Sequence, residues 1–157
     1  MATTLLVIGV LMLSAALVLT FMPLTSSMIF ALFGVWAMNR SGYLHVSSSQ
    51  LMFWLTFTII LLVISRIRGD KAILTANMRR FMAIGGIAGT VVAVAVGATV
   101  NTVALGPLAG SAAGALFFFR SRRVAIDRGT FQAVAPALLP MVVTYTLMGI
   151  TLIGILQ

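Results

Sequence analysis

The sequence predicts an all-α, polytopic transmembrane bundle built from two inverted-topology repeats. Each repeat is expected to contain a proline-broken helical hairpin and one spanning helix, which gives about six hydrophobic segments. Composition is the first ground: 61% of the 157 residues are hydrophobic, 8% are charged, and the mean hydropathy is +1.17. Soluble domains contain only about 45 to 50% apolar residues and need a polar exterior. Two long uncharged stretches and the placement of the cations are the other grounds.

The first uncharged stretch covers residues 2–39. As one straight helix it would extend about 57 Å, whereas the hydrocarbon core of a bilayer is about 30 Å thick. The chain is therefore expected to turn back at Pro23, because proline lacks an N–H group and disfavours helix at the preceding residue. Helical arms are predicted at residues 4–22 and 24–38.

The second uncharged stretch, residues 81–119, is also too long for one crossing. Its break is predicted at Asn101–Pro107. The chain reads PLTSSMIFALF from Pro23 to Phe33 and PLAGSAAGALF from Pro107 to Phe117, and six of these eleven positions agree. Both phrases begin at the predicted turn and continue into the second arm of a hairpin, which favours an internal repeat.

Two further apolar runs, residues 49–65 and 131–156, are expected to span singly. Bends are predicted in the second of them at Pro136 and Pro140. The two runs complete the repeats as their third segments.

Nine of the ten lysines and arginines fall in two loops. The first group is Arg66, Arg68, Lys71, Arg79 and Arg80, and the second is Arg120, Arg122, Arg123 and Arg128. If the second uncharged stretch folds back, both groups lie on one face and only Arg40 lies opposite. Because cytoplasmic loops are enriched in lysine and arginine, we expect a multi-pass protein of the bacterial inner (cytoplasmic) membrane with both termini external.

These assignments divide one integral membrane domain, residues 1–157, into three parts. The first repeat covers residues 1–65, a basic cytoplasmic connector covers 66–80, and the second repeat covers 81–157. Each repeat crosses an odd number of times, so the two are expected to have opposite polarity, as in many secondary transporters.

Small residues recur every four positions in the second uncharged stretch. Six glycines are expected to pack helices closely there: Gly85, Gly89, Gly97, Gly106, Gly110 and Gly114. The first hairpin has no equivalent stripe.

The side chains offer little acid–base or metal chemistry. The only carboxylates, Asp70 and Asp127, lie within the basic loops, and His45 has no second ligand-type residue nearby. There is no cysteine. No catalytic residue, metal or cofactor is therefore expected, and the chain is not expected to be an enzyme.

The polar residues expected at membrane depth are neutral and flank the two breaks. The hypothesis is that they bind a substrate where the breaks meet, and the predicted residues are Thr25, Ser26, Ser27, Asn101, Thr102 and Ser111. Thr20 and Thr99 stand beside them. The alternative is that these side chains only satisfy backbone groups at the turns.

The basic loops are expected to face anionic phospholipids. Head-group contacts are predicted for Arg66, Arg68, Arg79, Arg80, Arg120, Arg122 and Arg123. A topology signal alone is the alternative explanation. The clustering of cations on the predicted cytoplasmic side is enough to explain the net charge of +8, so nucleic acid is not an expected partner.

The layout resembles a family of small bacterial membrane proteins catalogued as domain of unknown function 456. The resemblance covers nearly the whole chain and rests on Pro23 and Leu24 in the first hairpin and on Gly106, Pro107, Gly110 and Gly114 in the second. It implies the same order of broken hairpin, single span, cationic connector, glycine-rich stretch and final hydrophobic segment. It implies no particular activity.

The leading functional prediction is a transporter-like or channel-like core for a small neutral or anionic solute, or for a lipid head group. The alternative is a structural or accessory subunit that self-associates or docks a membrane partner through its glycine seams. An enzyme acting on lipids ranks third. Glycine seams that are buried within the chain around a polar cavity would favour transport, whereas seams that face lipid would favour assembly.

Overall fold

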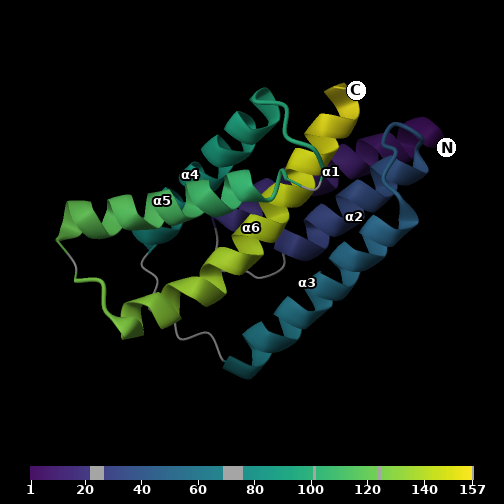
Figure 1. The fold of residues 1–157 in the computed structure, drawn as a ribbon. Helices are drawn as coiled ribbons and strands as arrows, with labels where there is room; N and C mark the ends of the chain where they lie inside the picture. The colour runs from purple at the N-terminus through teal and green to yellow at the C-terminus, as the bar shows by residue number, and fades with distance from the viewer. Residues whose placement is uncertain (22–26, 69–75, 101, 124, 157) are drawn as a thin grey trace.

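The computed structural model describes residues 1–21, 27–68, 76–100, 102–123 and 125–156, and every regular element in these ranges is an α-helix. The helices are α1 (Ala2–Thr20), α2 (Ser27–Arg40), α3 (Ser48–Arg68), α4 (Ala76–Ala95), α5 (Leu105–Arg122) and α6 (Arg128–Leu156) (Figure 1). Three of these are long and apolar enough to cross a membrane: α1, the Asn77–Ala95 part of α4, and α6. This supports the prediction of a helical membrane protein.

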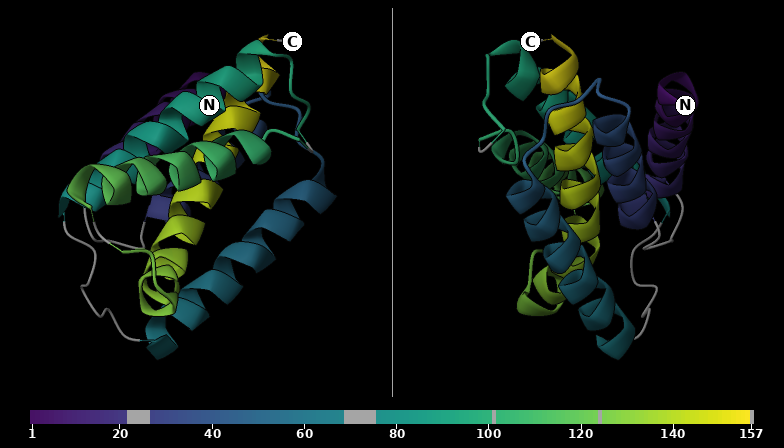
Figure 2. Two further views of the ribbon diagram at one scale, coloured as in Figure 1. Left: turned by 60° about the vertical axis from the view of Figure 1, so that its left-hand side comes forward. Right: turned by 90° about the vertical axis from the view of Figure 1, so that its right-hand side faces the viewer.

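Helix α6 lies at the centre of the bundle and packs against each of the other five helices (Figures 1 and 2). Its inward residues Val143, Leu147 and Ile150 are buried in the larger apolar core. The helix continues through both Pro136 and Pro140. A proline inside a helix removes a backbone hydrogen bond and often kinks the helix. Pro140 is nevertheless buried within α6, and Pro136 is half-buried.

Helices α1 and α2 form the first hairpin, and their backbones approach at one glycine pair. A Cβ added to Gly9 would lie 2.5 Å from Met38 Cγ and 3.0 Å from the carbonyl oxygen of Gly34. The predicted turn at Pro23 lies outside the described residues. Helix α1 has 19 residues, the same length as the predicted arm 4–22 but shifted toward the N-terminus, and α2 lies close to the predicted arm 24–38.

Helices α4 and α5 form the second hairpin, and their break comes earlier than predicted, at residues 96–104. Gly97 has φ +83 and ends α4, with the Ala98 N–H bonded to the Ala93 carbonyl (2.9 Å) and the Gly97 N–H to the Val94 carbonyl (3.0 Å). This is a Schellman motif, in which glycine adopts the left-handed conformation without steric cost. Pro107 lies in the first turn of α5, where a missing N–H costs nothing.

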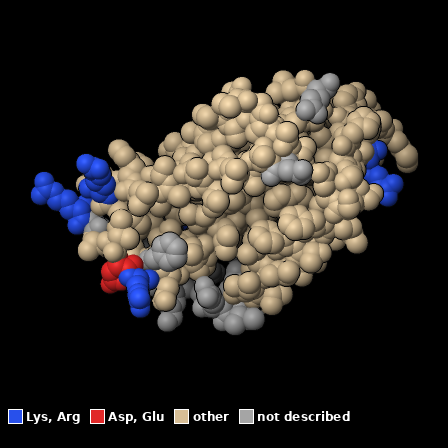
Figure 3. Space-filling model, in the orientation of Figure 1, with Lys and Arg blue, Asp and Glu red and all other residues tan. Residues whose placement is uncertain are grey.

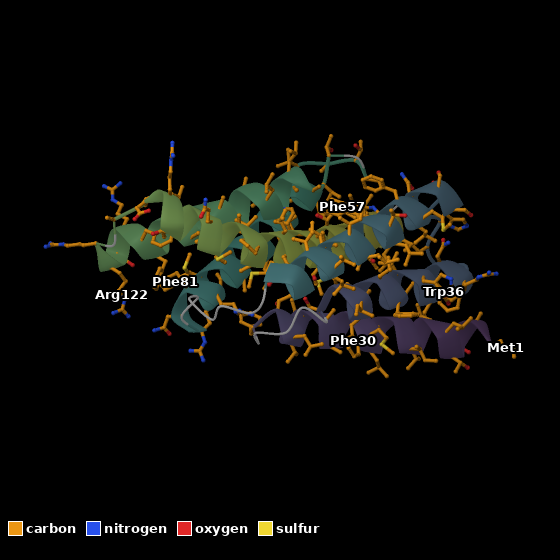
Figure 4. All side chains as sticks on the ribbon, turned by 90° about the horizontal axis from the view of Figure 1, so that it is seen from below. Met1, Phe30, Trp36, Phe57, Phe81 and Arg122 are labelled. Atoms are coloured by element: carbon orange, nitrogen blue, oxygen red, sulfur yellow. The ribbon has the colours of Figure 1, made fainter. Side chains whose placement is uncertain are left out.

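Consecutive helices alternate in direction, and charged residues gather at two opposite ends of the molecule (Figures 1 and 3). Phe81 and Arg122 lie at one end, whereas Met1 and Trp36 lie at the other (Figure 4). The Arg40 guanidinium lies 5.9 Å from the centre of the Trp36 ring, at the second end. A broad face without lysine or arginine lies between these ends in Figure 3, as a bilayer requires.

The third helices of the two predicted repeats do not occupy equivalent positions. Helix α3 packs mainly against α2 and α6, whereas α6 contacts both hairpins as well as α3. The predicted connector also has different limits, since residues 66–68 belong to α3 and residues 76–80 to α4. The inverted repeat therefore stays a prediction from the sequence.

Candidate functional site

A group of buried hydroxyls surrounds the middle of α6. We define the hydroxyl layer as Thr20 of α1, Ser27 of α2, Ser111 of α5, and Thr144 and Tyr145 of α6. Each of these residues is at most 2% exposed. The layer therefore joins both hairpins to the central helix with polar groups, inside a molecule whose surface between its ends is largely apolar.

One hydrogen-bonded chain in the layer starts at α2. Ser27 Oγ lies 3.2 Å from Thr144 Oγ1, and the Thr144 hydroxyl donates to the Pro140 carbonyl oxygen at 2.9 Å. A hydroxyl has one proton, so the Thr144 oxygen accepts and Ser27 donates. This chain connects the start of α2 to the proline-containing part of α6.

A second chain starts at the neighbouring α6 residue. The Tyr145 hydroxyl donates to Thr20 Oγ1 at 2.8 Å, and the Thr20 hydroxyl donates to the Leu17 carbonyl oxygen at 2.6 Å. The phenol thus reaches from the central helix to the end of α1. Other buried threonines of α4 and α6 differ, because Thr90 and Thr151 bond only to carbonyls of their own helices.

Ser111 brings the second hairpin to the layer. Its hydroxyl is buried and has no hydrogen-bond partner among the described residues. A Cβ added to Gly86 would lie 2.6 Å from Ser111 Oγ and 2.6 Å from Cδ2 of Tyr145. The absence of a side chain at Gly86 therefore leaves the space in which the serine and the tyrosine approach each other.

The directions of these bonds decide what the layer offers to a ligand. The protons of Ser27, Thr144, Tyr145 and Thr20 are already donated within the layer. Lone pairs remain on Ser27 and Tyr145, and one unengaged donor remains on Ser111. Such a set suits a neutral group that both donates and accepts. It suits an anion poorly, because an anion requires several donors.

The predicted substrate residues have different fates in the structure. Ser27 and Ser111 both lie in the hydroxyl layer. Thr102 does not reach it, because Thr102 is exposed in the 96–104 turn and its Oγ1 accepts from the Thr99 N–H at 2.9 Å. This is the turn-satisfying role that the sequence left as the alternative. Thr25, Ser26 and Asn101 lie outside the described residues.

Three important residues were not identified from the sequence: Gly86, Thr144 and Tyr145. Gly86 is next to the predicted stripe residue Gly85 but points toward α6 rather than along the α4–α5 contact. The available signal for the other two was the polar phrase TYT at 144–146, within an otherwise apolar span. Polar side chains inside a membrane helix usually face other helices.

Five of the six predicted packing glycines lie where α4 meets α5, and they are Gly85, Gly89, Gly106, Gly110 and Gly114. Added Cβ atoms at Gly85 and Gly89 would overlap the carbonyl oxygens of Gly110 and Gly106. The backbones therefore touch, and the stripe faces inward. Gly97 has no atom within 4 Å of its Cβ position; it serves the Schellman motif instead.

Among the predicted head-group arginines, five have side chains that the structure describes. Arg80, Arg120, Arg122 and Arg123 are exposed, and Arg79 is half-buried. The side chains of Arg66 and Arg68 lie outside the described part of the structure. Arg122, at the end of α5, lies at one end of the molecule (Figure 4). The head-group contacts stay a prediction.

No protein-family model, curated protein or solved structure matches this chain. The resemblance to the domain of unknown function 456 therefore stays a prediction from the sequence.

Proposed function

We propose that this protein passes a small, uncharged polar solute across the bacterial inner membrane through the hydroxyl layer. The observation that supports this proposal is that hydroxyls from α1, α2, α5 and α6 meet in the buried interior. Among them, the Ser111 hydroxyl has no hydrogen-bond partner within the described residues and lies near the Tyr145 ring. The bonding directions favour a neutral solute over the anion or lipid head group that the sequence also allowed.

The two hairpins provide the units that would move. In each hairpin, the two helices are in backbone contact at glycines. The contact is at Gly9 and Gly34 in the first hairpin and at the five α4–α5 glycines in the second. Their contacts with α6 use side chains and hydroxyl bonds, as at Ser27 and Tyr145. We envisage each hairpin shifting as a unit against α6, with the hairpins as opposite-polarity repeats and both termini external.

The glycine arrangement also bears on the alternative of an accessory subunit. Docking a partner through the seam requires glycines that face lipid, whereas the five α4–α5 glycines face each other within the chain. The contact geometry thus argues against docking of a partner through the α4–α5 glycines.

Flux through reconstituted vesicles tests the proposal. Glycerol and urea serve as uncharged probes, and swelling after an osmotic step is followed by light scattering. The wild-type protein should accelerate entry over protein-free vesicles. Ser111→Ala should slow protein-dependent entry by roughly tenfold. The solute would lose one hydrogen bond from a buried donor, and that loss costs about 1 to 3 kcal/mol.

The same variant separates transport from stability. Ser111→Ala removes a buried hydroxyl without a partner, so its melting temperature in detergent should be unchanged or higher. Thr151→Val is the matched control, since Thr151 is buried but bonds only to the Leu147 carbonyl of its own helix. Wild-type entry no faster than in protein-free vesicles, or full flux in Ser111→Ala, would contradict the proposal.

A further inference from the structure

The basic end of the molecule contains a groove that the proposed solute path does not use. The groove has a volume of about 680 Å³ and is lined by Leu116, Phe119, Arg120, Arg123, Ala125 and Ile126. Its residues come from the last two turns of α5 and the segment that leads to α6. Two guanidinium groups and several apolar side chains thus share one surface depression.

The two arginines of this groove have no neutralising partner within the described residues. The nearby carboxylate of Asp127 accepts the Gly129 N–H at 2.6 Å, at the start of α6. Neither Arg120 nor Arg123 forms an ion pair with any group that the structure describes. Two unpaired guanidinium groups lining one groove attract a phosphate strongly, because each can donate two hydrogen bonds in parallel.

Arg123 also has an unusual backbone conformation. Arg123 caps α5 in the left-handed conformation, with φ 51 and ψ 34, and its N–H bonds to the Arg120 carbonyl at 3.3 Å. Glycine is the unstrained residue at such a position. The chain instead has Arg123 there, and Arg123 lines the groove together with Arg120.

The apolar residues decide which source of phosphate fits. Leu116 and Ile126 are 56% and 60% exposed, and both line the groove beside the arginines. A free phosphate ion would gain nothing from them, whereas a phospholipid covers them with its acyl chains while its phosphate meets the guanidinium groups. Arg122, which lies between the groove residues Arg120 and Arg123 in the chain, is at one end of the molecule (Figure 4).

We infer that the groove formed by Arg120, Arg123, Leu116 and Ile126 binds one anionic phospholipid of the adjoining leaflet. This inference concerns one lipid-binding site, and it differs from the general attraction between a basic face and an anionic membrane. It selects Arg120 and Arg123 over Arg122 and Arg128, which are exposed on the same segment but do not line the groove. It is also independent of solute passage, since no residue of the hydroxyl layer takes part.

Native mass spectrometry of the detergent-purified protein tests this, with phosphatidylglycerol titrated against phosphatidylcholine. The wild type should retain phosphatidylglycerol preferentially. The double variant Arg120→Gln/Arg123→Gln should need about tenfold more phosphatidylglycerol for half occupancy. The matched pair Arg122→Gln/Arg128→Gln removes the same charge and should change occupancy less than about twofold.

Two further comparisons keep the outcomes distinct. Equal losses in both arginine pairs would overturn the inference, because the charge would then act collectively; so would full retention in the groove pair. Leu116→Asn/Ile126→Asn should also weaken phosphatidylglycerol binding. If that variant binds as well as wild type and inorganic phosphate displaces the lipid, the groove takes free anions and the lipid assignment is wrong.

Discussion

The phenol of Tyr145 ties the central helix α6 to the end of α1 by a hydrogen bond. Its hydroxyl donates to Thr20 Oγ1 at 2.8 Å, and its ring lies over Gly86. The bond joins residues far apart in sequence, so it contributes to tertiary structure rather than to either helix alone. Interhelical hydrogen bonds in membrane proteins stabilise by about 0.6 to 2 kcal/mol.

Tyr145→Phe should lower the free energy of unfolding by about 1 kcal/mol, because it removes one interhelical bond and keeps the ring. Thermal unfolding in detergent measures the effect. Tyr43→Phe is the control, since Tyr43 is 55% exposed. Equal melting temperatures for the two variants would show that the phenol hydroxyl contributes nothing to the native state.

Ser27 and Ser111 were predictable because they flank the breaks of two uncharged stretches, where polar residues are needed. Tyr145 was not, because average hydropathy describes residues 131–156 only as apolar. Its role depends on α6 lying between the hairpins, and that placement arises from contacts between segments distant in sequence. The fate of Thr102 likewise depended on local geometry, since the Schellman motif at Gly97 moved the break toward the N-terminus.

At the scale of helices, α4 and α5 approach each other closely because glycines at their contact have no side chains. Lipid offers no hydrophobic drive for association between helices, so close backbone packing supplies van der Waals energy instead. Gly110 contributes from α5, where an added Cβ would overlap the carbonyl oxygen of Gly85. The overlap involves backbone, which cannot move aside as a flexible side chain does.

Gly110→Ala should therefore destabilise the protein by about 1 to 3 kcal/mol, through forced separation of α4 and α5. Alanine is more favourable than glycine in a helix by about 1 kcal/mol, so any loss of stability would come from the packing of α4 against α5. Gly129→Ala is the matched control, because its Cβ would meet Asp127 Oδ1 at an ordinary 3.5 Å. Denaturant unfolding in mixed micelles measures both; a Gly110→Ala protein as stable as the control would contradict the packing argument.

The helices themselves were largely predictable. Segment length against bilayer thickness required both hairpins, and the structure has helices α1, α2, α4 and α5 close to the predicted arms. The glycine stripe was also readable, because spacing by four places residues on one helix face. The Gly9–Gly34 contact was not, since a single glycine on each helix forms no pattern until the two helices are paired.

At the scale of the whole molecule, the charged ends define two faces. Arg122 lies at one end and Met1 and Trp36 at the other (Figure 4). Hydropathy and charge predicted this arrangement, because lysine and arginine are costly at membrane depth. The central position of α6 was not predictable, since all apolar segments look alike to lipid and only side-chain packing selects neighbours.

Cysteine labelling tests the proposed sidedness, and the chain has no native cysteine to interfere. In intact cells, His45→Cys and Thr102→Cys should react with an impermeant maleimide added outside. Ala125→Cys should react only after the membrane is opened. All three positions are exposed. Labelling of Ala125→Cys from outside, on the same side as His45→Cys, would overturn the predicted topology and with it the opposite polarity of the two repeats. Labelling of Thr102→Cys from the side of Ala125→Cys would instead mean that the second hairpin turns back within the bilayer, which leaves that polarity unchanged.

The meeting of five helices on α6 has a consequence for biogenesis. α6 follows all of them in the chain, so the ribosome delivers it after both hairpins have been synthesised. Until then Thr20 and Ser27 lack their α6 partners, and the glycine contacts can hold each hairpin only as a separate unit. Assembly of this interior therefore waits for α6, which is synthesised after the five helices that it contacts.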